Sequence, residues 1–146
     1  MKGDAKPQVQ DIFRFVDDRG VLDQVLKEIP KIKRVYSTIS KFGVIRGMHG
    51  HFLEKKIFYV TKGSAKFVMA SMDEDPLKYG EITTFTLDEM KPQILILPPK
   101  YYHGYTSLGK ELRMMIFSDA TLEESKSDDH RLSPREFERY FEVQSK

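Results

Sequence analysis

The sequence predicts an all-β fold, a small barrel or sandwich of short strands. Between Val35 and Phe117, eight β-like runs follow one another at roughly ten-residue spacing, and turn residues separate them. No helical pattern lies between these runs, which excludes a parallel βαβ sheet. Ten Phe and seven Tyr also favour pleated, half-buried surfaces.

Composition indicates one ordinary globular domain over residues 1–146. Hydrophobic residues make up 40% and charged residues 32% of the chain. With 24 basic and 22 acidic residues, the net charge of +2 is too balanced to indicate a nucleic-acid or membrane-surface partner. Zero cysteines exclude disulfides and thiolate metal sites. The N-terminus lacks an apolar signal segment and no apolar run could span a bilayer, so we expect a cytoplasmic protein.

The first thirty residues carry weaker structural signals. Residues 1–9 form a polar stretch that we expect to be a loose lead-in. The segment Asp17–Gly20 is a turn signal. Residues 21–29 (VLDQVLKEI) predict one or two helical turns, which Pro30 would close because proline cannot continue a helix.

The eight runs define the predicted strands, and a helix follows them. The runs are VYSTI, GVIRGMHGHF, KIFYVT, SAKFVMASM, EITTFTL, QILILP, YYHGYTSL and LRMMIFS. Ser133, Pro134 and Glu136 then fit a capping box with proline at the first helical position. We therefore expect a helix over residues 133–143 that docks on the barrel through one aromatic face, formed by Phe137, Tyr140 and Phe141.

Three of the four histidines lie in two of these runs. His49 and His51 are two residues apart, so on a strand they point to the same face. Two imidazoles on an inner face cost free energy unless they are paired or used. The third, His103 of YYHGY, follows another apolar run. We predict a polar pocket inside the barrel; the alternative is a surface strand with two solvated histidines.

The spacing of these histidines resembles the two motifs of the cupin superfamily. Four residues fit the first motif: Gly43, His49, His51 and Gly63. Pro98 and His103 fit the second motif, with Lys100 where relatives have glycine. The resemblance implies a cupin (jelly-roll) β-barrel with short flanking helices, including the C-terminal one.

One position departs from the metal-binding cupins. Lys56 stands where they have a carboxylate ligand. A protonated ammonium repels a cation and offers no lone pair, so we expect neither a metal nor another cofactor. Glu54 is a substitute carboxylate, but strand alternation is against its facing the same way as His51 unless the turn after His51 reorients it. A pocket of His, Lys and Arg instead attracts anions, such as a diphosphate or an enolate oxygen.

Two families of nucleotide-sugar enzymes are more closely similar. Over about residues 43–118 the chain resembles dTDP-4-dehydrorhamnose 3,5-epimerases, which share the segment Gly43–His49, Lys56, and Pro98 with His103-Gly104-Tyr105. It also resembles dTDP-4-keto-6-deoxyhexose 3,4-ketoisomerases, which share Ile32–Tyr36, Arg46–His51 and Ser118-Asp119.

Two positions bear on the choice between these families. The epimerases usually have Gln at the position of His51, so this residue favours the ketoisomerases. The epimerases also use a tyrosine as general acid on the strand after the second motif. The corresponding stretch Met114–Phe117 has no tyrosine, which is evidence against double epimerisation.

The resemblance implies a metal-independent isomerase or epimerase. Its substrate would be a nucleotide-linked (dTDP) 4-keto-6-deoxyhexose, and the reaction would pass through an enolate in deoxysugar biosynthesis for surface polysaccharide. The resemblance also implies a homodimer whose protomers share strands. The choice between ketoisomerisation, 3-epimerisation and 3,5-epimerisation stays open. A non-catalytic sugar- or nucleotide-binding cupin and a metal-dependent cupin enzyme are the alternatives.

Roles for individual residues follow from the same resemblance. His49 is the expected base that removes the C3 proton. Lys56 and Arg46 would stabilise the enolate or hold hydroxyls, while His51 and Tyr36 are candidates for returning the proton. The other expected substrate contacts are His103, Tyr105, Lys100 and Arg113.

A base histidine commonly has a carboxylate partner that fixes its tautomer. The candidates for that partner are Asp128 and Asp129. Both belong to the charged stretch SKSDDHR, in which we expect His130 to be solvated.

Overall fold

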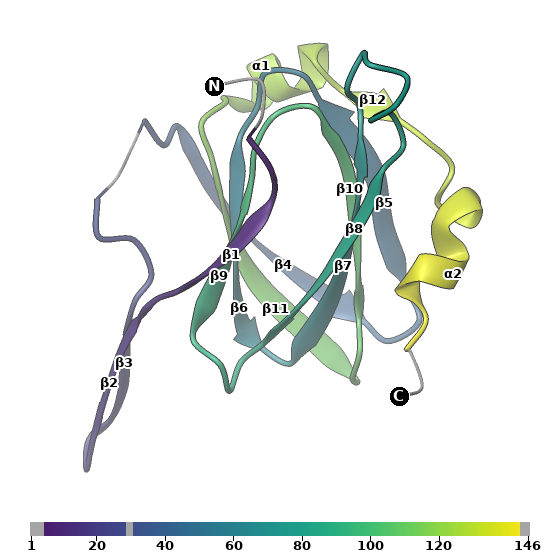
Figure 1. Cartoon of the computed structure of the whole chain (residues 1–146). Helices are drawn as coiled ribbons and strands as arrows, with labels where there is room; N and C mark the ends of the chain where they lie inside the picture. Colours follow the sequence, from purple (N-terminus) through teal and green to yellow (C-terminus); the bar gives the residue numbers. More distant parts are fainter. Residues whose placement is uncertain (1–4, 29–30, 144–146) are drawn as a thin grey trace.

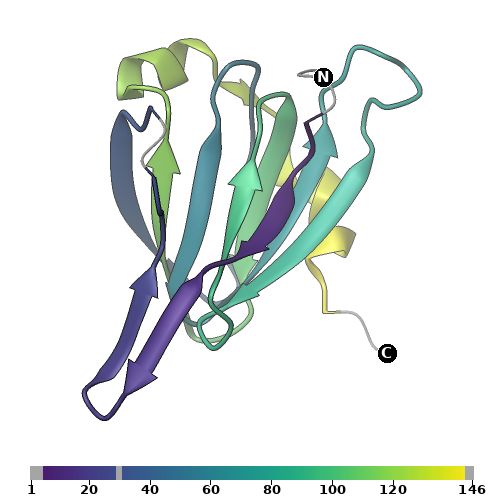
Figure 2. The same ribbon diagram turned by 60° about the vertical axis from the view of Figure 1, so that its left-hand side comes forward.

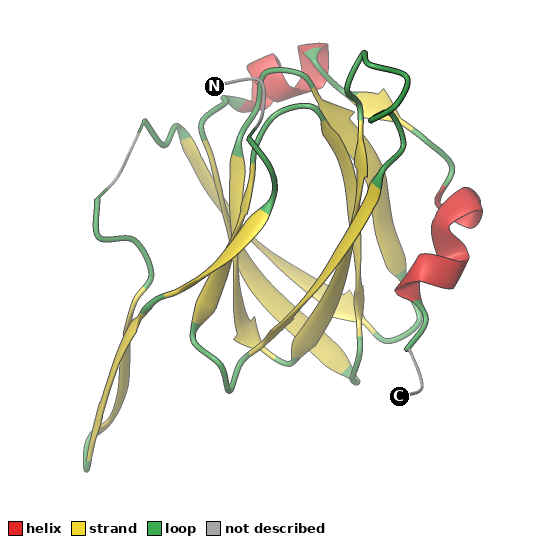
Figure 3. Ribbon diagram, viewed as in Figure 1, coloured by secondary structure: helices red, strands yellow, loops and turns green. Residues whose placement is uncertain are grey.

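Two five-stranded antiparallel sheets form the body of the protein in a computed structural model that describes residues 5–28 and 31–143 (Figure 1, Figure 3). The first sheet has the order β1-β9-β6-β11-β4, with bounds Gln8–Asp11, Gln93–Leu97, Lys56–Lys62, Glu111–Ser118 and Arg34–Lys41. The second has the order β12-β5-β10-β7-β8, with bounds His130–Arg131, Ile45–His51, Tyr101–Ser107, Ser64–Ser71 and Ile82–Asp88. The two sheets close on each other as the predicted all-β, jelly-roll barrel.

Apolar side chains fill the barrel because inward and outward residues alternate along its strands. In β11, Leu112, Met114 and Ile116 are buried, and the residues between them are more exposed. Phe58 and Phe67 meet across the core with their ring centroids 5.1 Å apart. The barrel interior is therefore a packed core, and a pocket can open only toward its ends.

All eight predicted strands are present, as β4 to β11, with bounds within two residues of those expected. Turn residues end these strands where the sequence predicted. The predicted lead-in over residues 1–9 is wrong in part, because it contains the beginning of β1. That strand pairs with β9 from Gln8 opposite Ile96 to Asp11 opposite Gln93. A four-residue edge strand is too short to give a periodic signal of its own.

The helix expected over residues 21–29 is also wrong where the structure describes it. Gly20–Gln24 forms β3, which pairs with β2 (Phe13–Asp17) across the predicted turn; residues 29 and 30 lie outside the described residues. Arg14 and Asp23 form an ion pair across this hairpin, with 2.7 Å between Nε and Oδ1. Such cross-strand pairs outweigh a weak helical preference.

The β2–β3 hairpin projects away from the barrel (Figure 1, Figure 2). Its base is attached to the first sheet, because the Tyr59 hydroxyl of β6 donates a hydrogen bond to Asp23. Phe15 and Leu22 oppose each other on one face of the hairpin and are 48% and 58% exposed. The hairpin thus presents apolar side chains that stay about half exposed.

Short helices flank the barrel, as predicted (Figure 3). A 3₁₀ turn (Pro134–Phe137) and α2 (Glu138–Phe141) occupy part of the predicted helix, and Phe141 is buried against Met48 of β5. Ser133 is the N-cap, but its side chain accepts from the Arg135 amide instead of forming the predicted capping box. An unpredicted helix, α1 (Leu122–Ser127), covers one end of the barrel. No helix in the described ranges is long and apolar enough to cross a membrane.

An extra residue in β5 decides which side chains enter the barrel. His49 lies opposite His103 of β10, but Arg46 lies opposite Tyr105, so Gly47 and Met48 together oppose the single residue Gly104. Directly opposed residues share a face of the sheet. This β-bulge therefore places Arg46 on the inner face with His49, although a spacing of three would separate them on a regular strand.

Gly47→Ala should distort this bulge and destabilise the fold. Gly47 has φ +152°, and an added Cβ would lie 2.5 Å from the Gly104 Cα, where only backbone could give way. We expect the free energy of unfolding to fall by about 2 kcal/mol or more in chemical denaturation. Gly109→Ala is the matched control, because a Cβ there meets open space and its effect should be close to zero. Equal stability of the two variants would contradict the prediction.

Candidate functional site

A pocket of about 490 Å³ opens at the end of the barrel where β4 and β6 begin and β5 ends. Four residues expected to carry chemistry line it: Tyr36, His49, His51 and Lys56. The other lining residues are Arg34, Leu122, Ser125, Lys126, Asp129 and Arg131. The pocket thus brings three strands together with the segment that runs from α1 to β12.

Strand register explains why the residues of the first sheet face this pocket. Ser118 of β11 lies between Arg34 of β4 and Lys56 of β6 and opposes both of them. The next inward rung holds Tyr36 opposite Ile116. Two cations and a phenol therefore line one wall above the apolar core.

His49 is paired with a carboxylate from a distant part of the chain. Its Nδ1 lies 3.4 Å from Asp129 Oδ1, and Arg131 Nε donates to the other oxygen at 2.9 Å. A carboxylate only accepts, so Nδ1 of a neutral His49 carries the proton and Nε2 keeps a lone pair. Of the two expected carboxylate candidates, the fold places Asp129 beside the His49 ring.

The protonation states of this pair suit a base. Burial lowers the pKa of His49 below its ordinary value of 6.5; the hydrogen bond to Asp129 opposes this shift in part. Burial acts to raise the pKa of Asp129, but its hydrogen bonds with Arg131 and His49 outweigh burial and lower that pKa. His49 is therefore neutral and Asp129 ionised at neutral pH.

Asp128 holds the loop and His51 in place. Its carboxylate accepts from the amides of Phe52 and Leu53, at 3.1 and 2.8 Å. His51 Nδ1 lies 2.7 Å from the Asp128 carbonyl, so this nitrogen donates and Nε2 of a neutral ring is left with a lone pair.

Lys56 is buried at the floor of the pocket beside the carboxylate of Glu54. Glu54 Oε2 lies 3.8 Å from Lys56 Nζ and 3.2 Å from Arg34 Nη2. Burial lowers the pKa of Lys56, and attraction to Glu54 opposes that shift. The turn reorients Glu54, which is the exception that the sequence analysis left open: residues 52–55 leave the strand, so alternation no longer applies.

Tyr36 and His103 complete the polar surroundings. Burial raises the pKa of Tyr36, which keeps its hydroxyl protonated, and the Arg34 guanidinium lies 5.0 Å from its ring centroid. His103 lies behind the pocket wall, with its ring centroid 6.1 Å from that of His51. Burial lowers the pKa of His103 well below its ordinary value, and its Nδ1 has no hydrogen-bond partner among the described residues.

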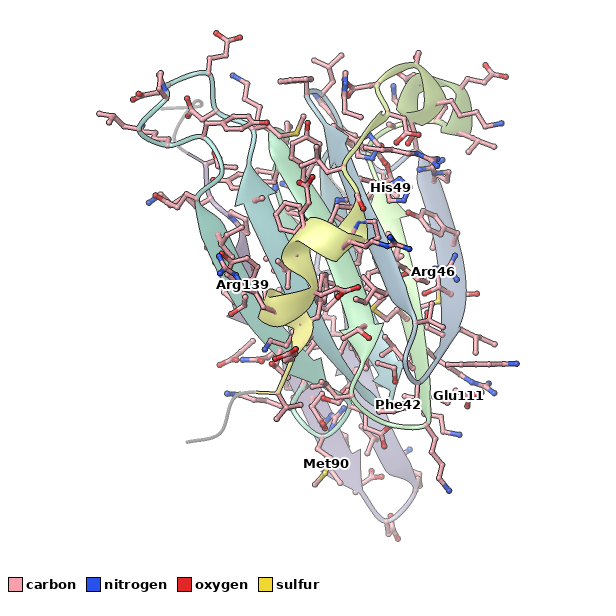
Figure 4. All side chains as sticks on the ribbon, turned by 90° about the vertical axis from the view of Figure 1, so that its right-hand side faces the viewer. Phe42, Arg46, His49, Met90, Glu111 and Arg139 are labelled. Atoms are coloured by element: carbon pink, nitrogen blue, oxygen red, sulfur yellow. The ribbon has the colours of Figure 1, made fainter. Side chains whose placement is uncertain are left out.

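The structure does not bring every expected residue to the pocket. Lys100 lines a separate hollow of about 460 Å³ beside Tyr101. Arg113 pairs with Glu111 at the far end of the barrel, and Tyr105 is buried in the apolar core with its hydroxyl 3.5 Å from Thr38 Oγ1. Arg46 shares the inner face but is exposed and lies between His49 and that far end, where Figure 4 labels Glu111. Arg113 therefore lies at the opposite end of the barrel from the pocket. Lys100 lies at the same end as the pocket, where its amide donates to the His51 carbonyl at 2.7 Å, but it does not line the pocket.

Several lining residues were missed by the sequence analysis. Arg34 belongs to the Ile32–Tyr36 segment that resembles the ketoisomerases, but no role was assigned to it. Arg131 gave no local signal, because its pairing with His49 joins segments far apart in the chain. A usable signal existed for α1: Thr121 and Glu124 form a capping box, which marks the start of that helix.

The polar residues do not form a metal-ligand cluster. Within residues 5–28 and 31–143, no three His, Asp or Glu side chains converge in a way that could hold a metal ion. His51 and Glu54 approach each other to 3.6 Å, but the Lys56 ammonium adjoins the same carboxylate. The arrangement suits proton transfer and the binding of negative charge instead.

Comparison of the sequence with protein families gives a match over most of the chain. Residues 15–130 match the family model described as polysaccharide biosynthesis C-terminal domain. The spore coat polysaccharide biosynthesis protein SpsL of Bacillus subtilis is 24% identical over 130 residues, covering 86% of each chain. The probable low-salt glycan biosynthesis epimerase Agl13 of Haloferax volcanii is 29% identical over 135 residues, covering 87% of this chain and 85% of the relative.

Solved structures confirm the predicted likeness to cupin-type sugar-nucleotide enzymes at the level of the fold. A dTDP-4-dehydrorhamnose 3,5-epimerase from Bacillus anthracis, with TDP and PPi bound, has a TM-score of 0.81 at 19% identity and covers 95% of this chain and 86% of its own. ChmJ, a 3'-monoepimerase from Streptomyces bikiniensis in complex with dTDP-quinovose, also has a TM-score of 0.81, at 14% identity, covering 90% of this chain and 72% of its own.

Asp129→Asn should lower the pKa of His49 further. The carboxylate attracts the imidazolium, so its loss favours the neutral ring and moves protonation of His49 to more acidic pH. NMR titration of the His49 ring protons measures this shift directly. Asp75→Asn, in the exposed β7–β8 loop, is the control and should leave the His49 midpoint where it is in the wild type. An unchanged or raised midpoint in Asp129→Asn would disprove the pairing.

Proposed function

Because the chain belongs to the polysaccharide biosynthesis C-terminal domain family, we propose that it is a metal-independent isomerase that epimerises a nucleotide-linked 4-keto-6-deoxyhexose at C3. The observation that carries this proposal is the pairing of His49 with Asp129 in a pocket that also holds Lys56. Removal of a proton next to a carbonyl needs a neutral base and a positive group for the developing enolate. This pocket contains both.

The relatives support the same class of substrate. Agl13 is named a probable epimerase of glycan biosynthesis, and SpsL a protein of spore coat polysaccharide biosynthesis. The structural neighbours bind TDP or dTDP-quinovose. We therefore propose a dTDP-linked deoxysugar as the substrate and surface polysaccharide biosynthesis as the setting.

The proposed reaction begins with transfer of the C3 proton to His49 Nε2. The electron pair of the broken C–H bond moves into the C3–C4 bond, and the C4 carbonyl oxygen becomes an enolate oxygen. The Lys56 ammonium stabilises this oxygen, because charge interactions strengthen where water is excluded. Asp129 stabilises the imidazolium that forms on His49.

Epimerisation then requires a proton from the opposite face of the sugar. Tyr36 is the proposed donor, because it lines the pocket from β4 while His49 lies on β5. Its raised pKa keeps the hydroxyl protonated at neutral pH. The enolate carbon takes the Tyr36 proton, and the phenolate regains a proton from solvent as His49 releases its own.

A second candidate reaction is 3,4-ketoisomerisation, which His51 favours. Its Nδ1 donates to a backbone carbonyl, which leaves Nε2 of the neutral ring as an acceptor within the same pocket. If a proton were delivered to C4 of an enediol intermediate, the carbonyl would move to C3. The experiment below separates this outcome from epimerisation.

His49→Asn should lower the turnover of dTDP-4-keto-6-deoxyglucose by about 10²- to 10⁴-fold, since it removes the base but keeps a side chain of similar shape. NMR of the incubation in D₂O with a chelator present measures the reaction. Deuterium at C3 alone indicates 3-epimerisation, label at C3 and C5 indicates 3,5-epimerisation, and a moved carbonyl indicates ketoisomerisation.

His130→Asn is the control for this experiment, because the ring of His130 does not line the pocket. Wild-type rates in His49→Asn would remove His49 from the mechanism. Loss of wild-type turnover in the chelator would overturn metal independence. No deuterium exchange by the wild type would favour a non-catalytic sugar-binding cupin.

We also propose that the protein works as a homodimer joined through the β2–β3 hairpin. The hairpin projects from the barrel with apolar side chains exposed, and burying such residues against a second copy is favourable (Figure 2). Phe15 and Leu22 form one such face. Strand exchange through a projecting hairpin is a low-cost route to a symmetric dimer.

The double substitution of Phe15 and Leu22 by Ser should weaken this dimer by about tenfold or more in Kd, because it removes two apolar contacts. Size-exclusion chromatography with light scattering over a dilution series measures the effect. Leu77→Ser removes a more exposed leucine in the β7–β8 loop, 92% exposed against 58% for Leu22, and should not alter the assembly. A wild-type protein that is monomeric at micromolar concentration would contradict the proposal.

A further inference from the structure

The pocket floor holds two cations that face the same small space. Arg34 and Lys56 flank Ser118 on neighbouring strands and point inward with it. Two strands that pair with the same central strand, as β4 and β6 pair with β11, lie about 10 Å apart, so long basic side chains on them can approach each other. Two like charges in a partly buried space repel each other unless an anion lies between them.

Glu54 supplies that anion. Its carboxylate is almost fully buried, with 1% of the side chain exposed. Oε2 accepts from the Ser118 hydroxyl at 2.5 Å and from Arg34 Nη2 at 3.2 Å, and it lies 3.8 Å from Lys56 Nζ. Oε1 lies 3.6 Å from His51 Nδ1 and has no hydrogen-bond partner among the described residues.

The turn that carries Glu54 is itself held on both sides. Asp128 accepts from the amides of Phe52 and Leu53, and Asp119 Oδ1 accepts from the Lys55 amide at 2.8 Å. These contacts turn residues 52–55 out of strand alternation, so that Glu54 points inward. Several hydrogen bonds to the turn therefore fix the inward direction of the Glu54 side chain.

We propose that Glu54 is a positioning residue, whose buried carboxylate holds the Lys56 ammonium and the Arg34 guanidinium in place at the pocket floor. The inference rests on the proposed function, because it is Lys56 that stabilises the enolate. Glu54 does not touch the reacting atoms in this assignment. It acts by keeping Lys56 protonated and directed into the pocket.

Electrostatics gives the proposal a measurable consequence. Burial favours the neutral amine of Lys56, and Arg34 adds repulsion, whereas Glu54 favours the ammonium. Without Glu54, the ammonium would lose its proton at lower pH. The other titratable groups around Lys56, from the elements packed against it, are Asp129, Tyr105, His49 and His103.

The test is a titration of Lys56 in the full-length protein, by NMR of lysine labelled with ¹³C at Cε. Lys56→Arg identifies the signal. In Glu54→Gln, which keeps the shape of the side chain and removes its charge, the Lys56 midpoint should fall by about one pH unit or more. Glu111→Gln, at the far end of the barrel, is the control and should leave the midpoint unchanged.

The pH profile of turnover provides a second measurement. Its alkaline limb should move to lower pH in Glu54→Gln, in step with the Lys56 midpoint, whereas Glu54→Asp keeps the charge and should restore much of the wild-type profile. An unchanged Lys56 midpoint in folded Glu54→Gln would overturn the proposal. Absence of wild-type turnover would instead refute the proposed function, and the titration would still decide the role of Glu54.

Arg34→Gln tests the same coupling if Glu54→Gln does not fold. This substitution removes the Arg34 charge, which repels the Lys56 ammonium and shares the Glu54 carboxylate with it. The pH midpoint of the Lys56 titration should therefore rise. A midpoint that stays constant or falls in Arg34→Gln would contradict the proposed sharing of Glu54.

Discussion

The pairing of β5 with β10 around Gly47 is the constraint on which the site depends. Gly47 and Met48 together oppose one residue of β10, and this extra residue restores Arg46 to the face that His49 occupies. Met48 precedes His49 and points to the opposite face by ordinary alternation, where it packs against Phe141 of the C-terminal helix. The irregularity therefore sets the direction of Arg46, while the regular pairing beyond it places His49 opposite His103 and His51 opposite Tyr101.

Burial gives the pocket side chains their chemical properties. Partial desolvation keeps His49 neutral and Tyr36 protonated at neutral pH. Desolvation also lowers the pKa of Lys56, and the nearby Glu54 carboxylate opposes this shift in favour of the ammonium. Burial thus favours a neutral His49, while Glu54 favours a charged Lys56 in the same pocket.

The accuracy of the sequence analysis varied with the range of the interactions involved. The strands β4 to β11 were predicted because alternation and Gly or Pro breakers are local signals. The segment at residues 21–29 was misread because a short apolar stretch fits a helical turn as well as a hairpin strand, and only the partner strand decides. Lys100 and Arg113 have suitable charges, but Lys100 lines a different hollow at the same end of the barrel and Arg113 lies at the opposite end.

The sequence by itself determined that a barrel would form and that His49 and His51 would share a face, because residues two apart on a strand point the same way. The resemblance to the cupin motif placed Lys56 with them. Only the tertiary structure decided which carboxylates join them. Asp129 reaches His49 through the pairing of β12 with β5, and Glu54 turns inward because other residues hold its turn. Contacts between distant segments and the direction of a turn leave no periodic pattern along the chain, and these two contacts complete the site.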